Sequence, residues 1–220
     1  MPRGGRRPGA GRPRGPGPWR NWVRTRDEVA ANTPVHVRLR VTEELGGLRK
    51  AVAYRAIAQA LRVALRRPDF RIVHASIQRD HIHLICEADD ASALARGMKS
   101  FQVSAAQHLN TSIGRERRGT VFPERYYVEP LETTQAVRDA LVHVLNNWRV
   151  HEESAGRSDV DAFSSAGAFD GWSRAVEHEP PAGCEPLPLA RPFTTMLATA
   201  WRRHDLVDPR EVSRYPEHAR

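Results

Sequence analysis

The sequence predicts an α+β fold in which the elements follow the order β-α-β-β-α-β and a third helix comes after them. Three observations predict it. Apolar and polar residues alternate in four short runs, apolar residues repeat at helical spacing in three longer runs, and the two patterns follow one another in that order. We expect a basic disordered arm over 1–32, one domain over 33–150, and an irregular extension with a short helix over 151–220.

The first expected strand has one apolar and one basic face. Between Thr33 and Val41, apolar side chains alternate with His36, Arg38 and Arg40. Such alternation is typical of a half-buried strand. We therefore expect this strand to turn three cationic or potentially cationic side chains away from the core.

A helix and two strands follow. Residues 48–67 carry an apolar stripe at helical spacing, and Pro68 ends the predicted helix. The next two strands span 70–77 and 81–88, and the short connection Arg79-Asp80 joins them. This connection makes the two strands antiparallel neighbours.

The second half of the domain repeats the alternation of helix and strand. A helix begins near Ala91 with Asp90 as its N-cap, a fourth strand spans 121–131, and a third helix begins at Thr133 or Thr134. The whole order is the ferredoxin-like arrangement, an antiparallel sheet with both crossover helices on one face. We expect the other face of the sheet to be free for function.

The composition favours a polyanionic partner. The formal net charge is +8, the pI is about 10.4, and nearly all cationic side chains are arginines, since Lys50 and Lys99 are the only lysines. Arginine binds two phosphate oxygens at once through its planar fork. A GC-rich genome also produces arginine-rich proteins without selection for phosphate binding, so charge alone leaves both explanations open.

Other classes of protein are excluded by composition. Two cysteines rule out a disulfide framework and a cysteine-rich zinc module. No run approaches the roughly 18 apolar residues of a membrane span, and no apolar segment follows the basic N-terminus as in a secretory signal. We therefore expect a cytoplasmic protein that does not bind membranes.

The strand over 81–88 carries the chemistry. Its apolar residues point to one face, and His81 and His83 point to the other. Two histidines at positions i and i+2 of a strand can bind one divalent cation, although most such pairs are ordinary exposed residues. In this fold the first and third strands are neighbours, so the basic face of the first strand would lie beside the two imidazoles. The sequence therefore predicts a metal site next to phosphate-binding groups.

The residues expected to bind DNA come from two segments. His36, Arg38 and Arg40 would act from the sheet, and Arg12 and Arg14 would act from the arm. The run around Arg12 and Arg14 looks like an AT-hook, but so short a string arises easily by chance. A general electrostatic attachment is the preferred interpretation.

The chain resembles the REP-associated tyrosine transposases, which belong to the single-tyrosine HUH (IS200-like) family. The resemblance covers most of the chain and depends on the order of several short strings. They are Pro34-Val35-His36-Val37, Asp80-His81-Ile82-His83-Leu84, Gly97-Met98-Lys99, Arg125-Tyr126, Val137-Arg138-Asp139-Ala140-Leu141, Asn147, Phe169-Asp170-Gly171-Trp172 and Trp201-Arg202-Arg203-His204.

The resemblance implies metal-dependent cleavage and transfer of single-stranded or hairpin DNA, by a monomer or a homodimer. It implies that His81, His83 and Asn147 hold Mg²⁺ or Mn²⁺ and that a tyrosine four residues before Asn147 attacks the scissile phosphate. The sequence departs from the pattern here, because His143 occupies the tyrosine position. Residues four apart share a helix face, so His143 and Asn147 should still point together.

Three interpretations of His143 remain open. The protein is catalytically impaired, a decayed or domesticated transposase that still binds metal and DNA. Alternatively, His143 acts as a nucleophile or as a general base for water. Finally, Tyr126 or Tyr127 replaces the missing nucleophile from the fourth strand, although that strand should not neighbour the strand over 81–88. We expect His74 and His108 to have structural or solvent-exposed roles.

Two other functions compete with these. An RNA-binding module of the same element order would carry aromatic residues on its two central strands, and this chain has His36, Arg38, His81 and His83 there instead. A non-catalytic DNA-binding or regulatory protein derived from a transposase agrees with the missing tyrosine.

The arm makes a testable prediction. Removing residues 1–18 should flatten the slope of log K against log salt for DNA binding. Without the arm, fewer arginine–phosphate contacts form, so binding releases fewer counterions from the DNA. Fluorescence anisotropy at several salt concentrations measures that slope. An identical slope with and without the arm would show that the arm does not contact DNA.

Overall fold

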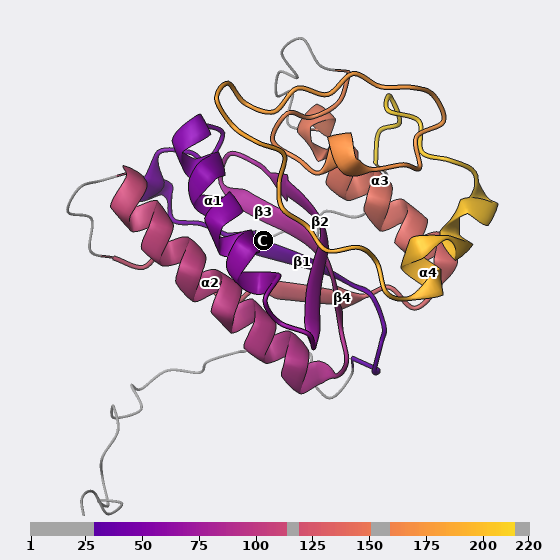
Figure 1. Cartoon of the computed structure of the whole chain (residues 1–220), viewed down its shortest axis with the longest axis horizontal. Helices are drawn as coiled ribbons and strands as arrows, with labels where there is room; N and C mark the ends of the chain where they lie inside the picture. Colours follow the sequence, from indigo (N-terminus) through magenta and orange to yellow (C-terminus); the bar gives the residue numbers. More distant parts are fainter. Residues whose placement is uncertain (1–28, 114–118, 151–158, 214–220) are drawn as a thin grey trace, which may run out of the picture.

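The computed structural model describes residues 29–113, 119–150 and 159–213 (Figure 1). The arm residues Arg12 and Arg14 lie outside this part of the chain. The main elements are β1 (Val35–Arg40), α1 (Ala51–Ala64), β2 (Phe70–Ile77), β3 (His81–Ala88), α2 (Ala91–Ile113), β4 (Tyr127–Pro130), α3 (Thr134–Val150) and the short α4 (Thr195–Ala198). Their order confirms the α+β, ferredoxin-like prediction.

The four strands form one antiparallel sheet in the order β2-β3-β1-β4. β1 and β3 are therefore central neighbours, as the sequence predicts. β4 is much shorter than the predicted strand over 121–131, because only Tyr127–Pro130 pairs with β1. Val121 instead packs into the core, and its carbonyl accepts a hydrogen bond from the Thr42 N–H at 2.9 Å.

One face of the sheet packs against α1 and α2 (Figure 1). The Asp90 side chain caps α2 by accepting a hydrogen bond from the Ala93 N–H at 2.6 Å, so the predicted N-cap is confirmed. α2 comes close to the sheet at Gly97. A Cβ atom added there would lie 2.1 Å from Cγ of the Phe70 ring, so this approach depends on the absence of a side chain.

The second face of the sheet is not free, which corrects the prediction. α3 crosses it, and the C-terminal segment packs beside α3 and contacts β2 and β3 (Figure 1). Arg40 of β1 and Tyr127 of β4 remain exposed. A second apolar core forms there around Ile85 of β3 and includes Leu141, Phe169 and Trp201. The sequence shows no periodicity after α3, so it gives no signal that this segment returns to the sheet.

Buried polar contacts hold the C-terminal segment in place. Glu87 of β3 is 1% exposed and accepts hydrogen bonds from the backbone N–H groups of Phe193 at 2.5 Å and Thr194 at 2.9 Å. Arg49 forms an ion pair with the fully buried Asp161 at 2.8 Å. A buried carboxylate is costly unless it is hydrogen-bonded, so these contacts are structural requirements of the covered face. None of the helices in the described residues has the length and apolar character needed to cross a membrane.

The close approach of α2 to β2 predicts how a methyl group added at Gly97 changes the stability of the protein. Gly97→Ala should lower the free energy of unfolding by about 1–3 kcal/mol, because the methyl group would overlap the Phe70 ring. Helix propensity alone would give the opposite sign. Urea denaturation measures the change, and Ser92→Ala at an exposed position of α2 is the control. A stabilised Gly97→Ala protein would show that the two elements can move apart.

Candidate functional site at the histidine cluster

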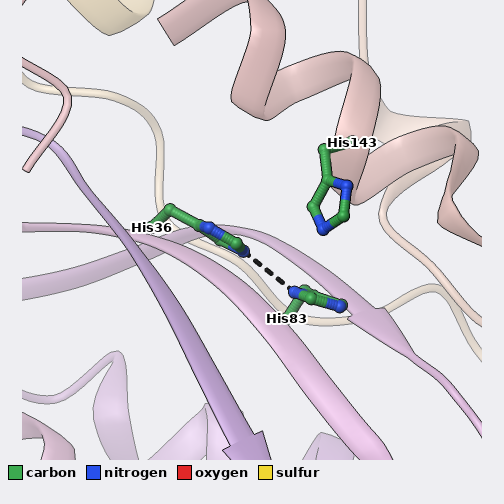
Figure 2. Close-up of side chains that lie close together, drawn as sticks. All are labelled: His36, His83 and His143. Atoms are coloured by element: carbon green, nitrogen blue, oxygen red, sulfur yellow. Dashed lines mark hydrogen bonds between the residues drawn. The ribbon is translucent and has the colours of Figure 1, made fainter. Parts of the chain in front are cut away.

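Two central strands and one helix bring four histidines together on the covered face of the sheet. We call His36, His81, His83 and His143 the histidine cluster. His36 lies on β1, His81 and His83 alternate on β3, and His143 comes from α3 (Figure 2 shows three of them). The predicted alternation of β3 is confirmed, since Ile82 and Leu84 enter the core under α1 and α2.

Three of the imidazoles are close enough to act as one group. His36 Nε2 and His83 Nδ1 are hydrogen-bonded at 2.9 Å, and their rings are stacked with centroids 5.1 Å apart. The His143 ring lies edge-on to His83, with centroids 4.7 Å apart, and one of its nitrogens points toward the other two rings (Figure 2). One ring nitrogen from each residue lies within 4.8 Å of the others. All three side chains are buried.

His81 lies at the accessible end of the cluster. Its ring is perpendicular to that of His83, with centroids 4.6 Å apart, and its side chain is 12% exposed. Its Nδ1 pairs with Asp80 Oδ1 at 2.7 Å, and this hydrogen bond lowers the pKa of Asp80 to about 2. The Asp80 carboxylate thereby orients the His81 ring and directs Nε2 away from Asp80.

The surroundings of His83 favour its neutral form. Burial lowers the pKa of His83 well below its ordinary value, and the neighbouring His36, His81, His143 and Arg38 lower it further. A neutral imidazole keeps one lone pair, which is the form that binds a cation. His83 is therefore held in the protonation state that a metal ligand needs.

Two buried polar atoms of the predicted metal ligands have no hydrogen-bond partner among the described residues. They are Nε2 of His83, which is 2% exposed, and Oδ1 of the fully buried Asn147. Buried polar atoms are nearly always paired, so an unpaired imidazole nitrogen and amide oxygen suggest an absent ligand. Both atoms are donors suited to a divalent cation, and both belong to the predicted metal set.

His143 is fixed from two sides. Asn147 Nδ2 donates to His143 Nε2 at 3.4 Å, and Nδ1 lies 3.1 Å from Oγ of Ser213 near the C-terminus. Because Nε2 accepts, Nδ1 carries the proton and donates to Ser213. The predicted sharing of one helix face by His143 and Asn147 is confirmed. Sequence reasoning missed Ser213, which lies 70 residues away in a segment without periodicity.

The predicted DNA-binding residues of β1 divide into two groups. His36 is 3% exposed and is bonded to His83, so it lies inside the cluster. Arg38 is half-buried and Arg40 is exposed, and they pair in register with His83 and His81 respectively. The two arginines therefore lie on β1 beside His83 and His81, with Arg40 next to the accessible end of the cluster. The alternation of β1 already placed His36 on the same face as the metal set, which was the available signal for its position.

The described tyrosines are outside the cluster. Tyr54 is buried under the other face, where its hydroxyl donates to the Glu185 carbonyl at 3.0 Å. Tyr127 is 40% exposed on β4 and pairs with Arg38, so it shares the face of the cluster but lies one strand further from β3 than β1 does. β4 does not neighbour β3, as the sequence predicts.

Comparisons with known proteins agree with this architecture. The sequence pattern of the family described as "Transposase IS200 like" matches residues 31–141, which end just before His143. A solved structure of a REP-associated tyrosine transposase bound to a REP hairpin is similar in fold. It has a TM-score of 0.51 and 12% sequence identity, and the match covers 64% of this chain and 80% of that one. The comparison with curated proteins found no match.

The family pattern covers all four strands, α1, α2 and the start of α3. It therefore includes every element of the sheet and three of the four histidines of the cluster. On this match over half of its length, the chain belongs to the IS200-like transposase family.

Proposed function

We propose that this protein binds single-stranded or hairpin DNA at the accessible end of the histidine cluster and that its strand-cleavage step is impaired. The observation that carries the proposal is the position of His143. Its ring faces His83 from α3 at a centroid distance of 4.7 Å, where the family resemblance expects the nucleophilic tyrosine. An imidazole there preserves the packing of the helix but removes the phenol hydroxyl.

The charge around the cluster supports a phosphate ligand. Arg40 is exposed and pairs in register with His81, and Arg38 lies between His83 and Tyr127 in the ladder. A phosphate that approached His81 would meet both guanidinium groups, which bind phosphate oxygens through paired N–H donors. The hairpin in the similar solved structure supports DNA as the source of that phosphate.

The unpaired atoms support a metal at the same end. Mg²⁺ or Mn²⁺ would be held by His81, His83 and Asn147, since His83 Nε2 and Asn147 Oδ1 lack partners among the described residues. When bound, the ion supplies Lewis-acid polarisation of the scissile phosphate. The protein's own contributions are to orient His81 through Asp80, to keep His83 neutral by burial, and to draw the phosphate in with Arg38 and Arg40.

A second candidate function is slow hydrolysis with His143 as general base. The hydrogen bonds of His143 agree with it, because Nδ1 carries the proton and the bond that Nε2 accepts from Asn147 is long, at 3.4 Å, and easily exchanged. Burial of His143 at 2% exposure argues against it, since water must reach the ring. The purely regulatory function differs from both in that it needs no chemistry at His143.

Metal binding can be tested on the folded protein. Replacing His81 and His83 together with alanine should abolish Mn²⁺ binding in calorimetry, because two of the three proposed ligands are lost. His108→Ala is the control, since His108 lies on α2, which packs against the opposite face of the sheet. Unchanged Mn²⁺ affinity in the double variant would contradict the proposed metal site.

The missing nucleophile can be restored. His143→Tyr should form a covalent adduct with labelled single-stranded DNA in the presence of Mn²⁺, because the phenol would project from α3 toward the same cluster. A denaturing gel detects the adduct, and His143→Phe is the matched control that lacks only the hydroxyl. The wild-type protein should give at most slow hydrolysis without an adduct.

Two results would contradict the role proposed for position 143. One is an adduct on the wild-type protein that peptide mapping assigns to Tyr126, Tyr127 or Tyr215, the last of which lies outside the described residues. The other is a His143→Tyr protein that binds Mn²⁺ and DNA normally but forms no adduct.

A further inference from the structure

The cluster contains a second set of cation ligands that the proposed Mg²⁺ or Mn²⁺ site does not use. His36 and His143 are not among the proposed Mg²⁺ or Mn²⁺ ligands His81, His83 and Asn147. Both nevertheless contact His83 in the protein interior. We propose that His36, His83 and His143 form a separate site for Zn²⁺ or a similar transition-metal ion, and that its occupation excludes the Mg²⁺ or Mn²⁺ site. The exclusion rests on the proposed function, because the two sites share His83.

The spacing of the three rings is close to that of a metal site. A zinc–nitrogen bond is about 2.0–2.1 Å long, so two ligands of one tetrahedral ion are about 3.4 Å apart. The three nitrogens lie within 4.8 Å of one another, and those of His36 and His83 are 2.9 Å apart. An approach of the His143 nitrogen by at most about 1.4 Å, with a slight opening between His36 and His83, gives the separations of a metal site.

His143 is the residue that can make this movement. His36 and His83 are fixed by the ladder between the two central strands. The His143 ring projects from a helix, and a small rotation about its side-chain bonds changes the position of Nε2. Its contact with Asn147 is long, at 3.4 Å, and is therefore easily exchanged for a metal bond.

The donor set decides which ion is preferred. Three imidazole ligands suit zinc, copper or nickel, whereas Mg²⁺ prefers oxygen ligands and keeps several waters. His36, His83 and His143 are 3%, 2% and 2% exposed, which leaves little room for a hydration shell. Asn147 and a DNA phosphate would instead supply oxygen donors at the neighbouring site. The two sites therefore differ in ligand chemistry although they share one residue.

Contacts around the three rings support a ligand function. Ser213 accepts the Nδ1 proton of His143, which assigns the lone pair to Nε2 on the side of the cluster. A hydrogen bond from the outer nitrogen of a ligating histidine fixes the tautomer and the ring orientation in metal sites.

The hydrogen bond between His36 and His83 explains why the two sites exclude each other. With an ion at the Mg²⁺ or Mn²⁺ site, His83 binds through Nε2 and its Nδ1 proton is donated to His36 Nε2. An ion in the three-histidine site binds Nδ1 of His83, which lies 2.9 Å from His36 Nε2, so the proton of this neutral ring moves to Nε2, the atom that the Mg²⁺ or Mn²⁺ site needs. Two divalent cations on one imidazole would also repel each other strongly. Zn²⁺ should therefore displace Mn²⁺.

The test compares single variants that each belong to only one site. Zn²⁺ and Mn²⁺ are titrated separately by calorimetry into the full-length wild-type protein and into His36→Gln, His81→Gln and His108→Gln. His36→Gln should weaken Zn²⁺ binding by about 100-fold or more, because a direct ligand is lost, and should change Mn²⁺ binding much less. His81→Gln should show the reverse pattern, and His108→Gln should resemble the wild type.

A spectroscopic measurement supports the assignment without activity. Co²⁺ bound to three imidazoles absorbs visible light, and the bands should disappear in His36→Gln but remain in His81→Gln. If His36→Gln does not fold by circular dichroism, His143→Phe provides the same test from α3. Zn²⁺ affinity unchanged in both variants would overturn the three-histidine site. If Mn²⁺ binding is unchanged in every variant, this result would instead count against the proposed function alone.

Discussion

The burial of β3 on both faces is the constraint on which the rest of this structure depends. A strand covered on one side can leave its polar residues in water, but β3 has no such side, and every residue from Ile82 to Ala88 is buried. Each polar side chain on it must therefore find a partner inside the protein. Glu87 finds the backbone of the C-terminal segment, and His83 finds His36. The site and the scaffold follow from the same requirement.

The C-terminal segment is part of the site as much as of the scaffold. Arg138 of α3 forms a pair of hydrogen bonds with the Glu211 carboxylate, both at 2.9 Å. Asn146 donates to the Asp208 and Glu211 carbonyl groups at 3.0 and 2.9 Å. These contacts fix α3 from its outer side while the sheet fixes it from its inner side. The direction of the His143 ring is thus determined by residues that the family match over 31–141 does not include.

The sequence predicts the sheet well because local periodicity encodes it. Alternation places His36, His81 and His83 on one face, and the spacing of four residues places His143 beside Asn147. The solvent exposure of these side chains is predicted poorly from the sequence, because it depends on the C-terminal segment, which carries no periodic pattern. His36 therefore looks like a surface residue in the sequence, although α3 and the C-terminal segment bury it. Ser213 lies beyond the reach of any local pattern for the same reason.

The packing of His143 also bears on how such a protein can evolve. Histidine and tyrosine codons differ by a single base, so one mutation suffices to exchange the two residues at position 143 in either direction. The imidazole now has polar neighbours at both nitrogens, Ser213 at one and Asn147 at the other. A phenol has one polar atom, so either the fully buried Asn147 or the half-buried Ser213 would lose its hydrogen bond to position 143. The genetic step is therefore small in either direction, while the loss of one of these two hydrogen bonds makes tyrosine the less favourable residue in the present surroundings.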